Sequence, residues 1–378
     1  MCHAVYIHIP FCSRKCNYCD FNSTSVPEIS LEHYTELLKE EIRAAADVKA
    51  VATVYFGGGT PSLLTPKAVS AIIDEIRSCC GILPDAEVTL EANPGTVTQK
   101  ALEGYLAGGV NRLSIGAQSL NDRELEFLGR IHSAGEARAA YAAARSAGFT
   151  NIGIDLMHSL PGQTLEGWQE TLEEAIAMKP EHISAYGLTI EPGTPLFTSL
   201  EVGEIEPQDE ELSAGMFELT AALLRQAGYE HYEISNFALP GYRSRHNQVY
   251  WQRGSYRGFG SGAHSFQREP RHGMRWANPA ELGSYAGWVK TGTLPEHEDL
   301  QKQDAMAEFF FLGLRMLEGV DLEKFCREFG VSAEVVYPGV IDRFIAAGLL
   351  RSSGANLQLT SQGVLLANTV LAEFIPSP

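Results

Sequence analysis

The chain has 378 residues, 44% of them hydrophobic, which is enough to build one large domain and a smaller one. Its 29 Lys and Arg residues against 47 Asp and Glu residues give a formal net charge of −18 at pH 7, which argues against nonspecific binding to nucleic acid or to an anionic membrane. The N-terminus lacks the charged and apolar regions of a signal peptide, and no apolar run reaches the roughly 18 residues of a transmembrane helix, so we expect a cytoplasmic protein.

Short β-branched runs alternate with amphipathic stretches over the first half of the chain, as in βαβ units on a parallel sheet. We predict strands at residues 5–9, 51–56, 87–91, 112–115, 151–156 and 182–188. Predicted helices follow at residues 31–46, 66–78, 99–107, 122–128, 135–147 and 165–178. Six such units indicate an α/β fold, an open partial (β/α)6 TIM-like barrel with its site at the carboxyl ends of the strands. A doubly wound sheet is the alternative, but no G-x-G-x-x-G sequence follows the first strand.

The first strand leads into a loop with the spacing Cys-x3-Cys-x2-Cys, at Cys12, Cys16 and Cys19. Thiolates are the usual ligands of iron–sulfur clusters, and three of them leave one iron of a [4Fe–4S] cluster free to bind a small molecule. The alternatives are unrelated thiols, or zinc held by three thiolates and a distant His, although zinc sites more often have a second Cys-x2-Cys pair. The remaining cysteines have no ligand spacing and are interpreted as ordinary core or surface thiols: Cys2, Cys79, Cys80 and Cys326.

Other predicted strands also end in polar or glycine-rich loops. Residues 57–61, Gly-Gly-Gly-Thr-Pro, let the backbone approach a ligand closely, although a triple glycine alone is usually only a tight turn. Glu91 ends the third strand, where its carboxylate could accept hydrogen bonds from hydroxyl or amino groups. Gln118, Arg130 and Asp155 lie near the ends of later units, and each could also be an ordinary polar cap. Their agreement in position favours one shared site.

The pattern changes after residue 205. A helix is predicted at residues 209–227, before a segment at residues 242–262 that is rich in aromatic residues, Arg and Gly. Helical periodicity returns at residue 304, followed by short helices at 322–328 and 333–347, hairpin strands at 348–350 and 357–360, and a final helix from 362. This order resembles a winged helix, which the net charge makes a poor candidate for reading DNA. We therefore divide the chain into a partial barrel with the cysteine loop (1–205), a connecting region (206–300) and a smaller, mainly helical C-terminal domain (301–378).

The connecting region contains the string H-N-x-x-Y-W at residues 246–251. Imidazole is a common ligand of haem iron, so His246 is a candidate ligand, and Tyr250 and Trp251 offer flat faces to a porphyrin. Asn247 could hold the imidazole in place. From the residues alone, a buried His in an aromatic cluster is the preferred alternative. His264 and His272 are alternative candidates for the iron ligand. Three nearby cations could pair with the haem propionates: Arg243, Arg245 and Arg253.

The cysteine loop resembles the signature of the radical S-adenosylmethionine (SAM) enzymes, in which SAM chelates the open iron and an electron from the cluster splits the sulfonium. A narrower resemblance, over most of the chain from about residue 3, is to the oxygen-independent coproporphyrinogen III oxidase family. It implies a [4Fe–4S] cluster on the three cysteines of the loop. The residues that would surround SAM are Tyr6, Tyr18, Gly58, Gly59, Thr60 and Glu91. Authentic oxidases bind a second SAM near the positions of Gln118, Arg130 and Asp155.

Two departures separate the chain from an authentic oxidase. Phe21 stands where the oxidase pattern has a fourth cysteine, and the H-N-x-x-Y-W string resembles the haem chaperone branch. We therefore predict a haem chaperone with a cluster, SAM and haem as cofactors and His246 as the axial ligand. Its partners would be a haem donor protein and haem-acceptor proteins, with respiratory haem proteins among the candidates, and a dimer is left open. The alternatives are oxidative decarboxylation of coproporphyrinogen III to protoporphyrinogen IX, or radical chemistry on another tetrapyrrole.

Overall fold

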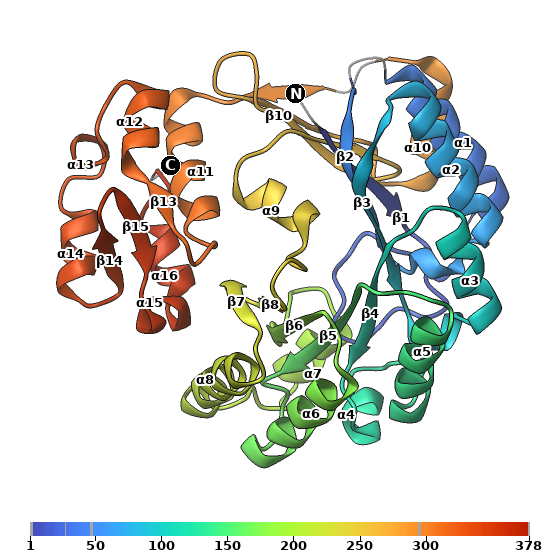
Figure 1. Cartoon of the computed structure of the whole chain (residues 1–378), viewed down its shortest axis with the longest axis horizontal. Helices are drawn as coiled ribbons and strands as arrows, with labels where there is room; N and C mark the ends of the chain where they lie inside the picture. Colours follow the sequence, from blue (N-terminus) through green and yellow to red (C-terminus); the bar gives the residue numbers. More distant parts are fainter. Residues whose placement is uncertain (1–2, 27, 46–47, 294–295, 377–378) are drawn as a thin grey trace.

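The computed structural model describes residues 3–26, 28–45, 48–293 and 296–376. Parallel strands follow one another through its first half: β1 (His3–Ile9), β2 (Val51–Gly58), β3 (Ile82–Ala92), β4 (Arg112–Gln118), β5 (Ile152–His158) and β6 (His182–Gly187). They lie side by side in chain order, and Figure 1 shows a curved sheet with helices on its convex side. The predicted open α/β barrel is confirmed, and each predicted strand overlaps an observed one.

The convex side is covered by α1 (Leu31–Ala44), α2 (Pro66–Cys79), α3 (Gln99–Ala107), α4 (Asp122–Phe127), α5 (Ala134–Ser146) and α6 (Leu165–Met178). Local capping explains where these helices begin. The side chains of Ser30, Thr98 and Thr164 each accept a hydrogen bond from the backbone N–H three residues later. The helices α3 and α6 have the predicted bounds. Ala46, the last residue of the first predicted helix, and Cys2 lie outside the described residues.

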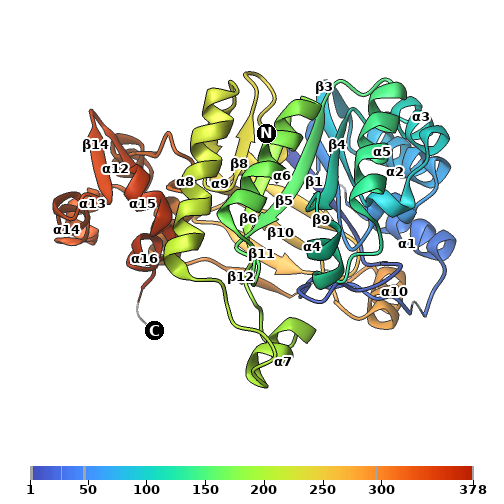
Figure 2. The same cartoon turned by 90° about the horizontal axis from the view of Figure 1, so that it is seen from below.

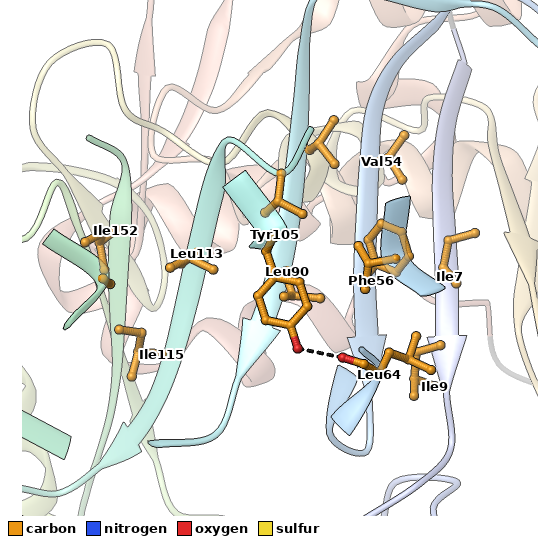
Figure 3. Close-up of a cluster of buried hydrophobic side chains, with 14 of the residues drawn as sticks. Ile7, Ile9, Val54, Phe56, Leu64, Leu90, Tyr105, Leu113, Ile115 and Ile152 are labelled. Atoms are coloured by element: carbon orange, nitrogen blue, oxygen red, sulfur yellow. Dashed lines mark hydrogen bonds between the residues drawn. The ribbon is translucent and has the colours of Figure 1, made fainter. Parts of the chain in front are cut away.

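Figure 3 shows the core between this sheet and its helices. Alternate residues of each strand point toward the helices, because side chains alternate between the two faces of a sheet. The buried apolar set includes Ile7, Ile9, Val54, Phe56, Leu90, Leu113, Ile115 and Ile152. Tyr105 of α3 packs in the same layer and donates its hydroxyl to the Leu64 carbonyl at 2.6 Å. The residues between these apolar positions therefore face the concave side.

The sheet does not end at six strands. On the β6 edge it gains β8 (Asn236–Ala238) and β7 (Glu230–Glu233), and on the β1 edge β9 (Tyr256–Phe259), β10 (His264–Gln267), β11 (Met274–Ala277) and β12 (His297–Asp299). The strand β9 pairs in parallel with β1. Helices α7 (Pro195–Glu201), α8 (Glu210–Gln226), α9 (Arg245–Trp251) and α10 (Leu282–Thr291) complete this region. In Figure 1, α9 lies on the concave side of the sheet. These strands were not predicted because they are too short to carry a strand pattern of their own.

A second hydrophobic core gathers residues from Ala305 to Phe374. Around it lie α11 (Lys302–Gly313), α12 (Leu322–Phe329), α13 (Ala333–Val336), α14 (Val340–Ala346), α15 (Ser361–Leu365) and α16 (Ala367–Ala372), with β13 (Val320–Asp321), β14 (Leu350–Ser353) and β15 (Asn356–Leu359). Figure 2 shows these elements beside the barrel. The structure contains the predicted hairpin as β14–β15, whereas the helix predicted at 333–347 is two helices, because Pro338 and Gly339 interrupt it. The three-part division of the chain stays a prediction.

Arg253 joins the β1 edge of the sheet to the C-terminal helices. Its side chain is 4% exposed, and its guanidinium lies 2.8 Å from a Glu308 oxygen and 3.3 Å from a Glu328 oxygen and donates to the His272 carbonyl at 2.6 Å. Such a buried, fully engaged cation fixes the two parts in one arrangement. Among the described residues, no helix has both the length and the apolar character needed to cross a membrane.

Candidate functional site

A cavity of about 360 Å³ lies on the concave side of the barrel. It extends from the cysteine loop, at the carboxyl ends of the strands, down to Arg112 and His182, the first residues of β4 and β6. Tyr6 and His246 do not line it. The other predicted site residues do: Cys12, Cys16, Tyr18, Cys19, Gly58, Gly59, Thr60, Glu91, Gln118, Arg130 and Asp155. The structure therefore brings most of the predicted site together around one space.

The cysteine loop is anchored to the barrel at both ends. The N–H of Cys12 donates to the Thr24 carbonyl at 2.9 Å, and the Thr24 N–H donates to the Pro10 carbonyl at 2.7 Å. In the middle of the loop, the N–H of Asn17 donates to the Leu128 carbonyl at 3.1 Å. Because these bonds use the backbone, they hold the loop in place while leaving its side chains free to face the cavity.

The three thiols are half-buried, and none is in a disulfide. Arg130 Nη1 lies 3.4 Å from Cys16 Sγ, and Thr60 Oγ1 lies 3.6 Å from Cys12 Sγ, so these two sulfurs each face a hydrogen-bond donor. In the described part of the chain, no three His, Cys, Asp or Glu side chains meet as ligands of one metal ion would. An iron–sulfur cluster instead distributes its thiolates over separate irons, and soft thiolates facing one cavity are the donor set that it requires.

The glycine run after β2 packs directly against β1 and the cysteine loop. A Cβ on Gly59 would lie 2.7 Å from the Phe11 carbonyl oxygen and 2.9 Å from Cys12 Sγ. A Cβ on Gly58, whose φ is +112°, would lie 2.6 Å from His8 Cε1. The close backbone approach predicted for this run is therefore present, but a side chain at Gly58 would meet His8 rather than the space of the cavity.

Two half-buried carboxylates, Glu91 and Asp155, line the cavity. Burial raises the pKa of Glu91 to about 7, helped by the charge of Asp155 and opposed by the Tyr55 hydroxyl, which donates to Glu91 Oε1 at 2.8 Å. Burial also raises the pKa of Asp155, while hydroxyl donors from Ser184 (2.7 Å) and Ser114 (3.0 Å) oppose the rise. Glu91 can thus gain or lose a proton near neutral pH, and it would be ionised by a cationic group bound beside it.

The end of β4 departs from regular strand geometry. Its pairing register with β5 shifts between Ile115 and Gln118, and Gln118 has a φ of +67°. Nearby, Arg130 Nη2 donates to the Gly116 carbonyl at 2.7 Å. A register shift re-aims the side chains that follow it, and here both Gln118 and Arg130 line the cavity.

The cavity is positive although the chain is strongly negative. Its charged lining residues are Arg14, Lys15, Arg112 and Arg130 against Glu91 and Asp155. The net charge of −18 therefore resides on other surfaces, and the cavity can accept an anionic group.

Tyr6 and His246 lie behind the cavity wall, where their rings cluster with that of Tyr55 and their centroids are 6.4 Å apart. The Tyr55 ring centroid is 5.0 Å from that of His246 and 6.2 Å from that of Tyr6. His246 is 1% exposed, and burial lowers its pKa to about 3, so the ring is neutral. Its Nδ1 is 2.8 Å from Thr53 Oγ1, and its Nε2 is 2.8 Å from the Tyr250 hydroxyl. Both nitrogens are therefore engaged within the protein.

The other members of the predicted haem region also have protein partners. Arg243 pairs with Glu230 and Glu318, Arg245 with Asp85, and Arg253 with Glu308 and Glu328. The guanidinium of Arg315 lies 4.4 Å from the Trp251 ring centroid. His264 is exposed, and His272 is half-buried. From α9, Asn247 is the residue that reaches the cavity.

Sequence reasoning missed several residues of the cavity wall: Tyr55, Arg112, Ser114, His182, Ser184 and Tyr186. A usable signal was the two-residue period of the strands. Ser114 follows Arg112 by two residues, and Ser184 follows His182 in the same way, so each pair shares a face. Polar residues repeating at this spacing in a buried parallel strand mark the face turned toward the site.

Comparisons with known proteins agree with this geometry. Residues 6–175 match the family model of the radical SAM superfamily, and residues 300–366 match that of the HemN C-terminal domain. An Escherichia coli protein named heme chaperone HemW is 39% identical over 376 residues, covering 98% of this chain and 98% of that protein. The Bacillus subtilis protein of the same name is 34% identical over 378 residues, covering 98% of this chain and 99% of that protein.

A mouse protein named radical S-adenosyl methionine domain-containing protein 1, mitochondrial, is 35% identical over 391 residues, covering 99% of this chain and 87% of that protein. Among solved structures, the coproporphyrinogen III oxidase HemN from Escherichia coli, described as a radical SAM enzyme, matches with a TM-score of 0.83. The match covers 99% of this chain and 90% of that chain at 24% identity, which shows a shared fold.

Proposed function

The chain belongs to the heme chaperone HemW family within the radical SAM superfamily, and on that premise we propose that it binds haem and transfers it to acceptor proteins. The observation that carries this proposal is similarity along the whole chain, since 98% of this chain and 98% of the Escherichia coli chaperone align at 39% identity. A match of this extent includes the barrel, the connecting region and the C-terminal helices together.

Membership of the superfamily implies a [4Fe–4S] cluster and SAM. We propose that Cys12, Cys16 and Cys19 hold the cluster, which when bound supplies the electron that splits the SAM sulfonium. The remaining roles belong to residues of the cavity wall. Glu91 would accept a hydrogen bond from a cationic amino group, because its pKa of about 7 lets a bound cation ionise it. Arg130 would hold the Cys16 sulfur in position through their 3.4 Å contact.

Further contacts of SAM are proposed from the same wall: Tyr18, Gly58, Gly59, Thr60, Gln118 and Asp155. Tyr6 would act indirectly, since its ring stacks on Tyr55 at 6.2 Å and Tyr55 in turn donates to Glu91. This chain of contacts positions the carboxylate rather than touching a ligand.

We propose His246 as the axial ligand of haem, in a conformation in which Tyr250 has moved away from it. A neutral imidazole is the form that binds iron, and burial already keeps His246 neutral. Its Nε2 must first lose the 2.8 Å contact with the Tyr250 hydroxyl. The Tyr250→Phe variant removes that competitor and should bind haem at least as tightly as the wild type, whereas His246→Ala should weaken binding and shift the Soret band. Equal spectra and affinities in His246→Ala would assign the ligand elsewhere, and His264→Ala and His272→Ala then identify it.

The experiment that tests the function uses anaerobically reconstituted protein. Haem is titrated into it, and the loaded protein is mixed with a haem-free globin while the transfer is followed by absorbance. A parallel sample receives SAM, a reductant and coproporphyrinogen III. We expect haem binding and transfer without protoporphyrinogen IX. Formation of protoporphyrinogen IX would establish the oxidase alternative, and an absence of haem binding would refute the chaperone proposal.

One residue supports the chaperone over the oxidase. Phe21 occupies the position of the fourth cysteine in the oxidase pattern, lines the cavity and is 62% exposed. An apolar ring at this point replaces a potential ligand or redox group at the mouth of the cavity.

A further inference from the structure

Arg112 is a buried cation without a direct partner. It is the first residue of β4, its side chain is among the largest that are fully buried, and it lines the cavity from the inside of the barrel. Its Nε has no hydrogen-bond partner, and among the described residues no carboxylate forms an ion pair with it. A buried guanidinium normally has a carboxylate within reach, because leaving it unpaired costs several kcal/mol.

The nearby carboxylates are already used. Glu87 accepts from the N–H groups of His246 at 3.0 Å and Arg245 at 3.1 Å, at the start of α9. Asp155 accepts from the hydroxyls of two serines on β4 and β6. These charges act on Arg112 through space, but they leave its N–H donors without an acceptor.

A second unpartnered group lies beside the first. His182 is 1% exposed, and its Nδ1 has no partner, while its Nε2 is 2.8 Å from the Tyr232 hydroxyl. That hydroxyl accepts from the Ser244 N–H at 3.3 Å, so its own proton is available to His182 Nε2. The tautomer inferred from this network carries its hydrogen on Nδ1, which then is a free donor.

Gly153 keeps a space open between these two donors. A Cβ on Gly153 would lie 3.4 Å from His182 Nδ1 and 3.6 Å from Arg112 Nη2. Both donors therefore border one small volume. Asn247 of α9 also lines the cavity with its side-chain amide. The same helix is held at its start by a hydrogen bond from the His246 N–H to Glu87.

We propose that Arg112, His182 and Asn247 form a subsite that binds a carboxylate group at the end of the cavity where β4 and β6 begin. A guanidinium binds a carboxylate with paired, charge-assisted hydrogen bonds, and the imidazole N–H supplies a further donor. Two sources fit this chemistry: a propionate of a tetrapyrrole, and the α-carboxylate of a second SAM molecule other than the one on the open iron. The subsite lies far from the cysteine loop, because the six residue steps of β4 from Arg112 to Gln118 span about 20 Å.

The ligands for the test are chosen from the proposed function. The subsite itself is inferred from the unpartnered donors of Arg112 and His182. Arg112→Gln and wild-type protein, both reconstituted with the cluster, are titrated with SAM, decarboxylated SAM, haem and haem dimethyl ester. We expect Arg112→Gln to weaken binding of one carboxylate-bearing ligand by about tenfold to a hundredfold, as loss of a charged hydrogen bond predicts. The matching ligand without that carboxylate should bind both proteins equally, and the affected pair identifies the source.

Equal affinities of the two proteins for SAM and for haem would overturn the proposal and leave Arg112 as a structural cation. If Arg112→Gln does not give a wild-type circular dichroism spectrum, Asn247→Leu carries the test with the same ligands, and Gln252→Leu, at the exposed end of α9, is its control. Equal affinities in Asn247→Leu would then overturn the proposal. Wild-type protein that binds SAM but no haem would refute the proposed function alone, and the two SAM ligands would still decide the subsite.

Discussion

The Glu91→Gln substitution separates charge from shape at the cavity wall. Gln keeps an oxygen that can accept the Tyr55 hydroxyl, now 2.8 Å from Glu91 Oε1, but it cannot ionise. Burial raises the pKa of Glu91 from its ordinary 4.5 to about 7. Between these two pH values the folded protein holds a proton that the unfolded chain has lost. Stability therefore falls as the pH rises from about 4.5 to about 7 and stays reduced above it.

The size of this effect follows from the pKa values. Each pKa unit is worth about 1.4 kcal/mol, so ionised Glu91 lowers the free energy of unfolding by about 3 kcal/mol above pH 7. This is an upper value, because water in the cavity would stabilise the carboxylate. We expect ligand-free Glu91→Gln to be more stable than the wild type by up to about 3 kcal/mol at pH 8 and by less than about 1 kcal/mol at pH 5.

Urea unfolding at the two pH values measures the difference, and SAM titrations measure its functional consequence. Wild-type affinity for SAM should rise as the pH passes 7 and Glu91 ionises, and Glu91→Gln should bind SAM weakly at every pH. Tyr55→Phe is the matched control: it removes the donor to Glu91 without changing charge, and it should move the wild-type transition to higher pH. An equal stability difference at pH 5 and pH 8 would refute the assigned pKa, and unchanged SAM binding in Glu91→Gln would remove Glu91 from the site.

Three further results are expected. Cys16→Ala should lower the iron content of reconstituted protein from about four per chain to near zero with an unchanged far-ultraviolet circular dichroism spectrum, and normal iron would locate the cluster elsewhere. Gly58→Val should lower the melting temperature more than Gly241→Val, since both have positive φ but only the first would crowd a neighbour, His8; equal shifts would show that backbone strain alone matters. Arg253→Met should cost about 3–5 kcal/mol in urea unfolding, because it strands two partly or fully buried carboxylates, and a cost below 1 kcal/mol would contradict that role.

The elements that could be predicted are those whose signals are local. Helices 99–107 and 165–178 match α3 and α6 because Thr98 and Thr164 cap them within one turn. The strand β9 has four residues and pairs with β1, although the two strands lie far apart in the sequence. No local pattern names a partner so far away, so the extended sheet could be found only from the structure.

The same distinction holds within the site. The cysteine spacing is local, and Cys12, Cys16 and Cys19 were found from it. Arg112 and His182 were not, because the two-residue period places each of them on one face of its strand but does not say that this face lines a cavity. Their importance depends on which face of the sheet is concave and on the fact that Arg112 Nε and His182 Nδ1 have no hydrogen-bond partner.

The H-N-x-x-Y-W helix shows why a motif can be recognised before its role is understood. Its His246 stacks on Tyr55, Asn247 reaches the cavity, and Trp251 packs under Arg315 from the C-terminal part. A helix of seven residues is not stable alone, so contacts such as these stabilise its conformation. His246 cannot bind iron and keep its bond to the Tyr250 hydroxyl, which lies on the same helix. Freeing His246 Nε2 for haem therefore requires the Tyr250 side chain to move, and because Asn247 of the same helix lines the cavity, we expect haem binding at His246 to be coupled to the proposed SAM site.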